Sequence, residues 1–316
     1  MADTAHTSHR GAASGPQPGD QPSGPQRSGL LSAGPQLGMP VMAGSAVLFS
    51  LMSFLIPLTH GVSAFIIVSA RFVVGILVIV CAAVVTRTPL KAVNKWWLVA
   101  RGVIGASSVY LLFRGIMNLG LGQGTILNYT YPIFAALLAP VMIGEKLTWD
   151  VLASGLLSFV GIWLVVSPGP ISSINTETLL ALLGGVLSGI AVVAIKKLRE
   201  TETPSIIYLA QCVFGLLVVG WPTATSSFAF GALQWLILLA LGIVATAAQL
   251  TMTWAYKHVP ATEGSLLAFL TPVLNVLLGV LVFGEQMRPM MLVGSALVLA
   301  CCGYIAFREK ILRLFG

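Results

Sequence analysis

Long apolar segments follow one another along this chain, and most of them are close to 20 residues long. A helix needs about 20 apolar residues to cross a bilayer, and these segments are too long and too uniform to be barrel strands. Only 9% of the residues are charged, whereas a soluble domain carries about 25%. We therefore predict an all-α integral membrane protein with ten transmembrane helices, at about 38–57, 62–85, 97–117, 122–143, 149–167, 177–195, 205–221, 232–256, 260–283 and 289–307.

The basic residues predict how these helices are oriented. If the N-terminus is cytoplasmic, 14 of the 17 Lys and Arg residues, Arg101 among them, fall on the cytoplasmic side, while Arg114 and Arg288 fall outside. Cytoplasmic loops carry such an excess of basic residues. We predict a multi-pass protein of the cell membrane with both termini in the cytoplasm. The lipid bilayer, rather than nucleic acid, then explains the net charge of +7.

The chain also repeats itself at an offset of 140 residues. Gly, Pro and Glu positions coincide at this offset, namely Gly44 with Gly184, Gly75 with Gly215, Pro132 with Pro272, and Gly144-Glu145 with Gly284-Glu285. Each half holds five segments, and an odd number places the second half upside down relative to the first. The predicted domains are a disordered tail rich in Gly, Pro and Ser over 1–37, a first repeat over 38–167, a linker over 168–176, a second repeat over 177–307 and a basic cytoplasmic tail over 308–316.

Three stretches of the chain resemble the EamA-like family of the drug/metabolite transporter superfamily. They are Ala70-Arg71-Phe72, TYPIFAALLAPVMIGEKLT at 130–148 and YKHVPATEGSLLAFLTPVLNVLLGVLVFGEQ at 256–286. The resemblance covers 38–307 and implies a secondary transporter of small organic solutes, with two five-helix repeats around a central cavity. It implies no single substrate, because members resemble exporters of amino acids and toxic metabolites or carriers of vitamins and nucleotide-like compounds.

Pro132 and Pro272 lie inside the fourth segment of each half. Each lacks a backbone N–H, which leaves the carbonyl four residues earlier, at Asn128 and Ala268, without its helical partner. In hydrocarbon such a carbonyl needs protein, water or ligand instead. We interpret both prolines as bends that line a substrate cavity, and a static kink that only shapes packing is the alternative.

Arg71 is the one charge well inside a predicted segment. An unsatisfied arginine there costs at least about 2.5–3.5 kcal/mol, so it should face the interior of the bundle. It binds an anionic substrate or a gate residue, or it caps carbonyls and fixes packing. The repeat places Gln211 at the equivalent position. Arg114, near the outer end of the third segment, either draws anions inward or reaches to the membrane interface.

Polar and aromatic side chains gather in the third, fourth, eighth and ninth segments, which the resemblance places around the cavity. As a set they suit a solute with an apolar or aromatic surface and a few hydrogen-bonding groups. Besides the arginines and prolines, the candidate cavity residues are Tyr110, Asn128, Tyr131, Trp254, Tyr256, Thr271 and Asn275.

Glu145 and Glu285 end the fourth segment of each half, on opposite sides of the membrane. A carboxylate at a segment end can cap a helix or lie at the interface, and this is the interpretation we favour. A gate formed with a basic residue is the alternative.

The chemistry that the sequence lacks narrows its function. No acidic residue lies in mid-segment, and no phosphate-binding loop, metal cluster or catalytic set is visible, so we expect no enzyme, no cofactor and no metal. We predict a carrier, monomeric or homodimeric, that exports an amino-acid-like or amphipathic solute by alternating access. The alternative is uptake of a vitamin or nucleoside-like cofactor such as riboflavin or S-adenosylmethionine. Facilitated movement and proton antiport both remain open.

Overall fold

A computed structural model describes residues 34–119, 121–166, 176–283 and 289–304, the last range without 291, 295 and 302. The chain divides into two units, Met1–Gly34 and Pro35–Gly316, and the fold below is that of the second. The predicted N-terminal tail and linker lie mostly outside the described residues, and the predicted C-terminal tail lies wholly outside them.

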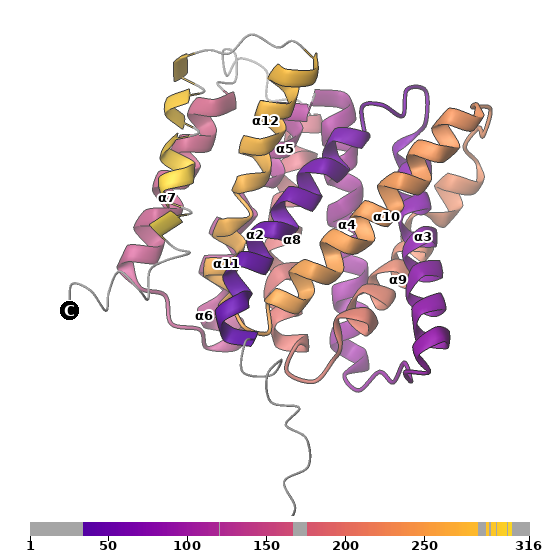
Figure 1. Ribbon diagram of the computed structural model, residues 1–316, viewed down its shortest axis with the longest axis horizontal. Coiled ribbons are helices and arrows are strands. Elements are labelled where there is room, and N and C mark those ends of the chain that lie inside the picture. Colours follow the sequence, from indigo (N-terminus) through magenta and orange to yellow (C-terminus); the bar gives the residue numbers. More distant parts are fainter. Residues whose placement is uncertain are drawn as a thin grey trace, which may run out of the picture. The chain divides into compact units, whose positions relative to one another are not determined.

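The described residues form helices joined by turns and no strand, which confirms the predicted all-α fold. The helices are α2 (Gly34–Leu55), α3 (Ala64–Thr86), α4 (Lys95–Leu119), α5 (Leu121–Asn128), α6 (Tyr131–Ile143), α7 (Trp149–Val166), α8 (Thr176–Leu198), α9 (Pro204–Ala224), α10 (Ala232–Ala255), α11 (Ala261–Leu267) and α12 (Leu270–Phe283), shown in Figure 1.

Six of the described helices, α2, α3, α4, α8, α9 and α10, are long and apolar enough to cross a membrane. Shorter apolar helices cover Tyr131–Ile143, Trp149–Gly161 and Leu292–Cys301. The count of ten transmembrane helices therefore stays a prediction. Helix α2 begins at Gly34, before the expected segment start at 38, and its apolar part of membrane length covers Leu37–Leu55.

The fourth segment of each half is broken just before its proline. Helix α5 ends at Asn128 and α6 begins at Tyr131, and likewise α11 ends at Leu267 and α12 begins at Leu270. The Ala268 carbonyl, which Pro272 deprives of its helical partner, accepts a hydrogen bond from the N–H of Thr271 at 2.9 Å in a tight turn. At the first break the Thr130 hydroxyl donates to the Leu127 carbonyl at 2.8 Å. A local turn thus satisfies the carbonyl that Pro272 disturbs, and a threonine side chain satisfies a carbonyl at the end of the helix before Pro132.

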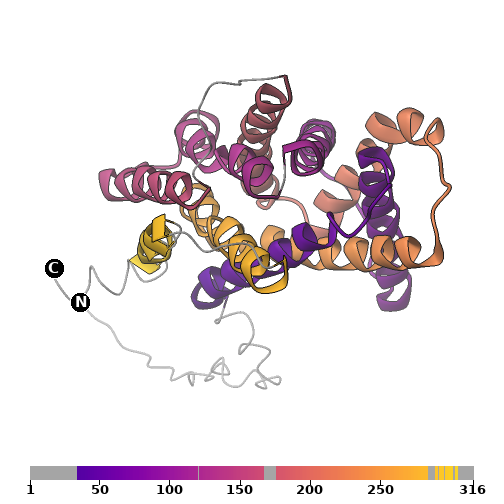
Figure 2. The ribbon, with the colours of Figure 1, turned by 90° about the horizontal axis from the view of Figure 1, so that it is seen from above.

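Helices of the first half pack against helices of the second. Helix α3 contacts α9 and α10, α4 contacts α8 and α9, and α6 contacts α8. Glycine allows the close approach of α4 to α9, since a Cβ on Gly102 would lie 2.8 Å from Cδ2 of Phe214. Helix α2 lies beside α12 (Figure 1 and Figure 2), where the Ser50 hydroxyl donates to Oδ1 of Asn275 at 2.6 Å.

Two contacts join segments that the predicted topology places on the same side of the membrane. Oε1 of Glu202 accepts hydrogen bonds from the N–H groups of Val93 and Asn94, at 2.7 and 2.6 Å, so two loops predicted to be cytoplasmic lie together. Arg114 and Glu177, both predicted to be at the outer side, form an ion pair at 2.6 Å. Which end faces the cytoplasm stays a prediction.

Candidate functional site

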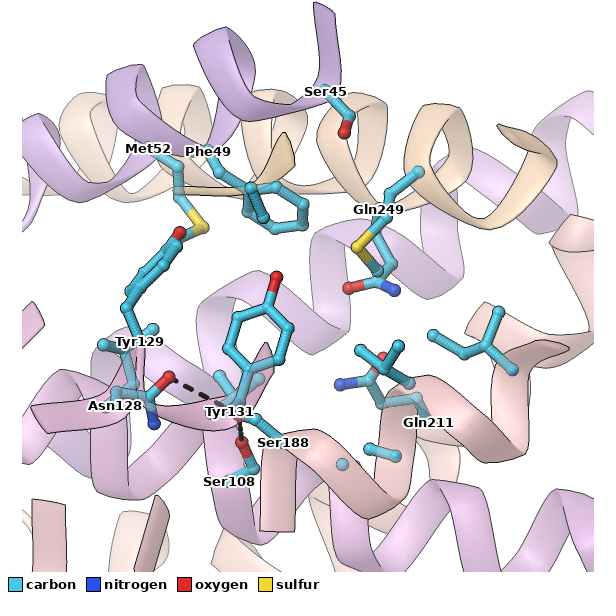
Figure 3. Close-up of a pocket in the computed structure, with 18 of the residues that line it drawn as sticks. Ser45, Phe49, Met52, Ser108, Asn128, Tyr129, Tyr131, Ser188, Gln211 and Gln249 are labelled. Atoms are coloured by element: carbon cyan, nitrogen blue, oxygen red, sulfur yellow. Dashed lines mark hydrogen bonds between the residues drawn. The ribbon is translucent and has the colours of Figure 1, made fainter. Parts of the chain in front are cut away.

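A cavity of about 90 Å³ is lined by residues of both halves. Its walls come from α2, α3, α4, α6, α8, α9 and α10 and from the ends of the broken helices. About 10–15 Å³ of such space holds one water molecule, so this cavity has room for several waters or for a small organic group. Figure 3 shows part of the lining.

Arg71, on α3, lines this cavity as its position inside a segment suggested. Its side chain is only 1% exposed. One guanidinium nitrogen, Nη2, donates to Oε1 of Gln249 at 3.3 Å, and Nη1 lies 3.5 Å from the sulfur of Met52. The guanidinium also lies 5.8 Å from the ring centre of Phe113, within the range of a cation–π contact. The positive charge is therefore held in place by neutral groups.

Arg101 is a second buried arginine of the cavity, which the sequence interpretation missed. The prediction grouped it with the charges of the cytoplasmic side, but it lies on α4, 3% exposed, and lines the cavity. Its Nη2 donates to Oε1 of Gln211 at 3.1 Å. Arg71 is therefore not the only buried arginine of the lining. Gly105, one turn later, makes room for the side chain, because a Cβ there would lie 2.7 Å from Cζ of Arg101.

Hydroxyl and amide groups form another wall of the cavity. The hydroxyls of Ser108 and Ser188, from α4 and α8, are hydrogen-bonded to each other, and Ser188 also donates to Oδ1 of Asn128 at 3.4 Å. Figure 3 shows this chain of contacts beside Tyr131, whose hydroxyl points into the space between the walls. The rings of Tyr129 and Tyr131 lie 5.6 Å apart. The helix break before Pro132 thus brings an amide and two phenols into the lining.

Two of the other predicted cavity residues lie at the predicted outer end instead. The guanidinium of Arg114 donates to both carboxylate oxygens of Glu177, at 2.8 and 2.6 Å, and to the Tyr110 hydroxyl at 3.3 Å. Tyr110 in turn stacks on Phe65, with ring centres 4.6 Å apart. Neither residue lines the cavity, and the Arg114 side chain is 37% exposed.

The remaining predicted cavity residues of the second half stand behind the lining. The Thr271 hydroxyl donates to the Ala46 carbonyl at 3.1 Å, and Asn275 accepts from α2, so both fasten α2 to α12. Trp254 packs against His258, with ring centres 4.7 Å apart. Tyr256 is fully buried in the hydrophobic core. Pro132 and Pro272 do not line the cavity themselves.

Glu145 caps a helix of the other half rather than the helix that follows it. Its Oε2 accepts from the N–H of Ala261, the first residue of α11, at 3.1 Å. Burial raises the pKa of Glu145 above its ordinary value, and the positive charge of Lys196 acts in the opposite direction. Lys196 itself donates to the Val259 carbonyl at 2.8 Å. The capping geometry favours the span-end interpretation, while Glu285, its counterpart, lies outside the described residues.

The described residues contain no group of three or more His, Cys, Asp or Glu side chains that could hold a metal ion. The cavity lining likewise includes no His, Asp or Glu among the described residues. What the lining offers is hydrogen-bond donors, amide and hydroxyl oxygens, aromatic rings and two positive charges, which together suit the binding of a solute.

Comparison with known proteins agrees with the repeat. The chain belongs to the EamA-like transporter family, whose model matches residues 36–167 and again residues 175–307. It is 28% identical to the pseudopaline exporter CntI of Pseudomonas aeruginosa over 247 residues, which cover 77% of this chain and 86% of the exporter. It is 29% identical to the riboflavin transporter of Rhizobium johnstonii over 219 residues, which cover 68% of this chain and 71% of that protein.

A solved crystal structure has a similar fold, with a TM-score of 0.73. The match covers 85% of this chain and 97% of the other chain, at 18% sequence identity. At this identity the likeness concerns the fold alone.

Proposed function

We propose that this member of the EamA-like transporter family is a secondary carrier that moves a small organic solute out of the cell by alternating access. One observation carries the proposal. The cavity is lined by residues from both halves, at the point where the fourth segment of each half is broken. Carriers built from inverted repeats bind their substrate between the repeats, near such discontinuous helices, and rock one repeat against the other.

The lining suggests the kind of solute. Aromatic rings from Phe49, Tyr129 and Tyr131 offer apolar contact, while Asn128 and Ser188 offer a few polar groups. A binding site of this composition suits an amino-acid-like or amphipathic molecule with an apolar or aromatic part. The similarity to an exporter of pseudopaline supports outward movement. The similarity to a riboflavin transporter supports the alternative, uptake of a vitamin or nucleoside-like cofactor such as riboflavin or S-adenosylmethionine.

Facilitated movement is the coupling that we favour. A proton-coupled carrier usually keeps a carboxylate or histidine close to its substrate near the middle of the membrane, and the described lining contains neither. Movement down the gradient of the solute, or exchange of one solute for another, needs no such group.

A counterflow assay tests the carrier proposal. Proteoliposomes are loaded with one member of a panel of amino acids, aromatic acids, riboflavin and S-adenosylmethionine, and the entry of the same labelled compound is followed. We expect transient accumulation of at least one solute. Failure of the whole panel would refute the proposed carrier. Cellular solute content in an overproducing strain then separates export, which lowers it, from uptake, which raises it.

A matched pair of tryptophan substitutions links transport to the cavity. Ala191 lines the cavity from α8, so Ala191→Trp should fill it and abolish counterflow. Leu217, on α9, is 75% exposed on the apolar surface of the protein, so Leu217→Trp should leave counterflow unchanged. Equal activity of the two variants would show that solute passes elsewhere.

A further inference from the structure

The two arginines of the cavity have no negative counterpart in the part of the chain that the structure describes. Arg71 and Arg101 both line the cavity and are almost fully buried, and the charge of Arg71 acts on Arg101. No described carboxylate lies within ion-pair distance of either guanidinium, and the described ion pairs join other residues. Buried charges are ordinarily paired, because desolvation of an unpaired ion is costly.

Several N–H groups of these guanidinium ions also have no protein acceptor. Arg71 donates to one amide oxygen and to a thioether sulfur, which is a weak acceptor, while its Nε has no partner. Arg101 donates to one amide oxygen, and both its Nε and Nη1 have no partner. An anion with two oxygens, placed against such forks, can accept the remaining bonds and neutralise charge at the same time.

We propose that the solute of this carrier is a net anion whose carboxylate binds at Arg71 and Arg101. This inference rests on the proposed function and narrows its substrate class. Among the amino-acid-like and amphipathic solutes of the proposed function, the two arginines favour those with a net negative charge, because the described lining contains no carboxylate to balance them. The site therefore selects organic acids over uncharged or cationic molecules of the same shape.

The rest of the lining fits the remainder of such an acid. The labelled residues of Figure 3 place Gln211 and Gln249 on one side of the cavity and the hydroxyl and amide groups of Ser108, Ser188 and Asn128 on another. The aromatic rings lie between and around these polar groups. An organic acid with an aromatic or apolar body therefore has charge recognition from the arginines and apolar contact from the rings.

The first test compares carboxylates with their uncharged amides on the full-length protein in nanodiscs. The probes are acetate, succinate and 3-phenylpropionate, each beside acetamide, succinamide or 3-phenylpropionamide, and binding is read as a rise of the unfolding temperature with ligand concentration. We expect at least one carboxylate to bind about tenfold or more tightly than its amide, because hydrogen bonds to charged groups are the strong ones. Equal effects within all three pairs would overturn the proposal without any substitution.

Substitutions then assign the effect to the two arginines. Arg71→Gln and Arg101→Gln each remove one charge and should weaken carboxylate binding by about tenfold or more, with amide binding unchanged. Lys257→Gln removes one charge from an exposed loop position and is the control. The assignment of the carboxylate site to the two arginines is contradicted if both arginine variants bind the carboxylate as tightly as the parent protein does. It is also contradicted if Lys257→Gln weakens carboxylate binding as much as the arginine substitutions do. If a variant does not fold, the comparison of acids with amides on the unaltered protein still decides.

The outcomes also separate this inference from the proposed function. Transport of uncharged solutes, with no preference for carboxylates in binding, would refute the anion site and leave the carrier standing. Carboxylate binding that depends on the arginines, without counterflow of any solute, would refute the carrier and leave the anion site standing.

Discussion

Gly189 on α8 gives the sharpest test of how the cavity is held together. A Cβ at this position would lie 2.7 Å from Cβ of Phe134, and 3.1 Å from both the Ala135 nitrogen and the Tyr131 carbonyl oxygen. These neighbours belong to α6 and are backbone or near-backbone atoms, which cannot swing away as the tip of a long side chain can. Gly189→Ala should therefore push α8 away from α6. The displacement would occur next to Tyr131, whose side chain projects into the cavity.

The expected magnitude combines two opposing effects. Overpacking of a buried contact by one methyl group typically costs about 1–3 kcal/mol. Replacing glycine by alanine inside a helix returns about 0.5–1 kcal/mol. Gly44 on α2 supplies the control, because a Cβ there would meet nothing within 4 Å. Gly44→Ala should show only the gain from replacing glycine in a helix, without the cost of overpacking. The difference in unfolding free energy between the two variants should therefore equal the packing cost, about 1–3 kcal/mol.

The assay is unfolding of the purified protein in mixed micelles by titration with sodium dodecyl sulfate, followed by circular dichroism. We expect Gly189→Ala to unfold at a lower detergent fraction than the parent protein and Gly44→Ala at an equal or higher one. Counterflow should also be weaker in Gly189→Ala, because the Tyr131 backbone moves. Identical shifts in the two glycine variants would mean that α8 and α6 are not in close contact, and the reasoning would fail.

Three further predictions concern the ends of the helices. Burial raises the pKa of Glu145, so the folded protein favours the protonated carboxyl group. The contribution of this group to the free energy of unfolding should therefore be greatest at a pH below its ordinary pKa of 4.5. It should decline as the pH rises through the raised pKa. Glu145→Gln, which keeps a carbonyl for the Ala261 N–H, should be at least as stable as the parent at pH 7 and lose this pH dependence in thermal unfolding. Glu202→Ala should cost about 1–3 kcal/mol in the same measurement, because it removes the buried oxygen that accepts two backbone N–H groups, while the exposed Glu200→Ala should cost less than about 0.5 kcal/mol. Arg114→Gln should cost no more than about 1 kcal/mol, because its ion pair is partly exposed, and a larger loss would mean that the pair closes the outer end of the bundle.

The helices and the repeat were predictable because both depend on local or periodic features of the chain. Apolar runs of membrane length mark the long helices, and Gly, Pro and Glu positions mark the repeat. A bend at Pro132 and at Pro272 was also predicted, since a missing N–H acts on the same helix, and the structure has a break between two helices near each proline. How a freed carbonyl is satisfied depends on single neighbours, such as the Thr271 N–H that donates to the Ala268 carbonyl.

The lining of the cavity was predictable only in part. In a soluble helix the polar face points to water, but in this protein the lipid-facing and buried faces are both apolar, so periodicity gives a weak indication of orientation. Arg101 lies six residues after the start of α4, and its position alone fits a residue reaching to the interface as well as one turned inward. The same ambiguity led to the placement of Tyr110 and Arg114 in the cavity, whereas they lie together beside Glu177.

The divergence of the two repeats suggests how solute binding and repeat motion are coupled. Both arginines of the cavity belong to the first half, and both of their amide acceptors, Gln249 and Gln211, belong to the second. Position 211 is the repeat counterpart of Arg71, so the second half carries an amide acceptor where the first half carries a charge. In alternating access the repeats move against each other, and these bonds between halves must rearrange. A carboxylate at the arginines competes with the same amide oxygens and is the stronger acceptor. Binding of the proposed solute would thus weaken the arginine–glutamine hydrogen bonds that oppose the movement of one repeat against the other. Without solute, these hydrogen bonds would stay intact.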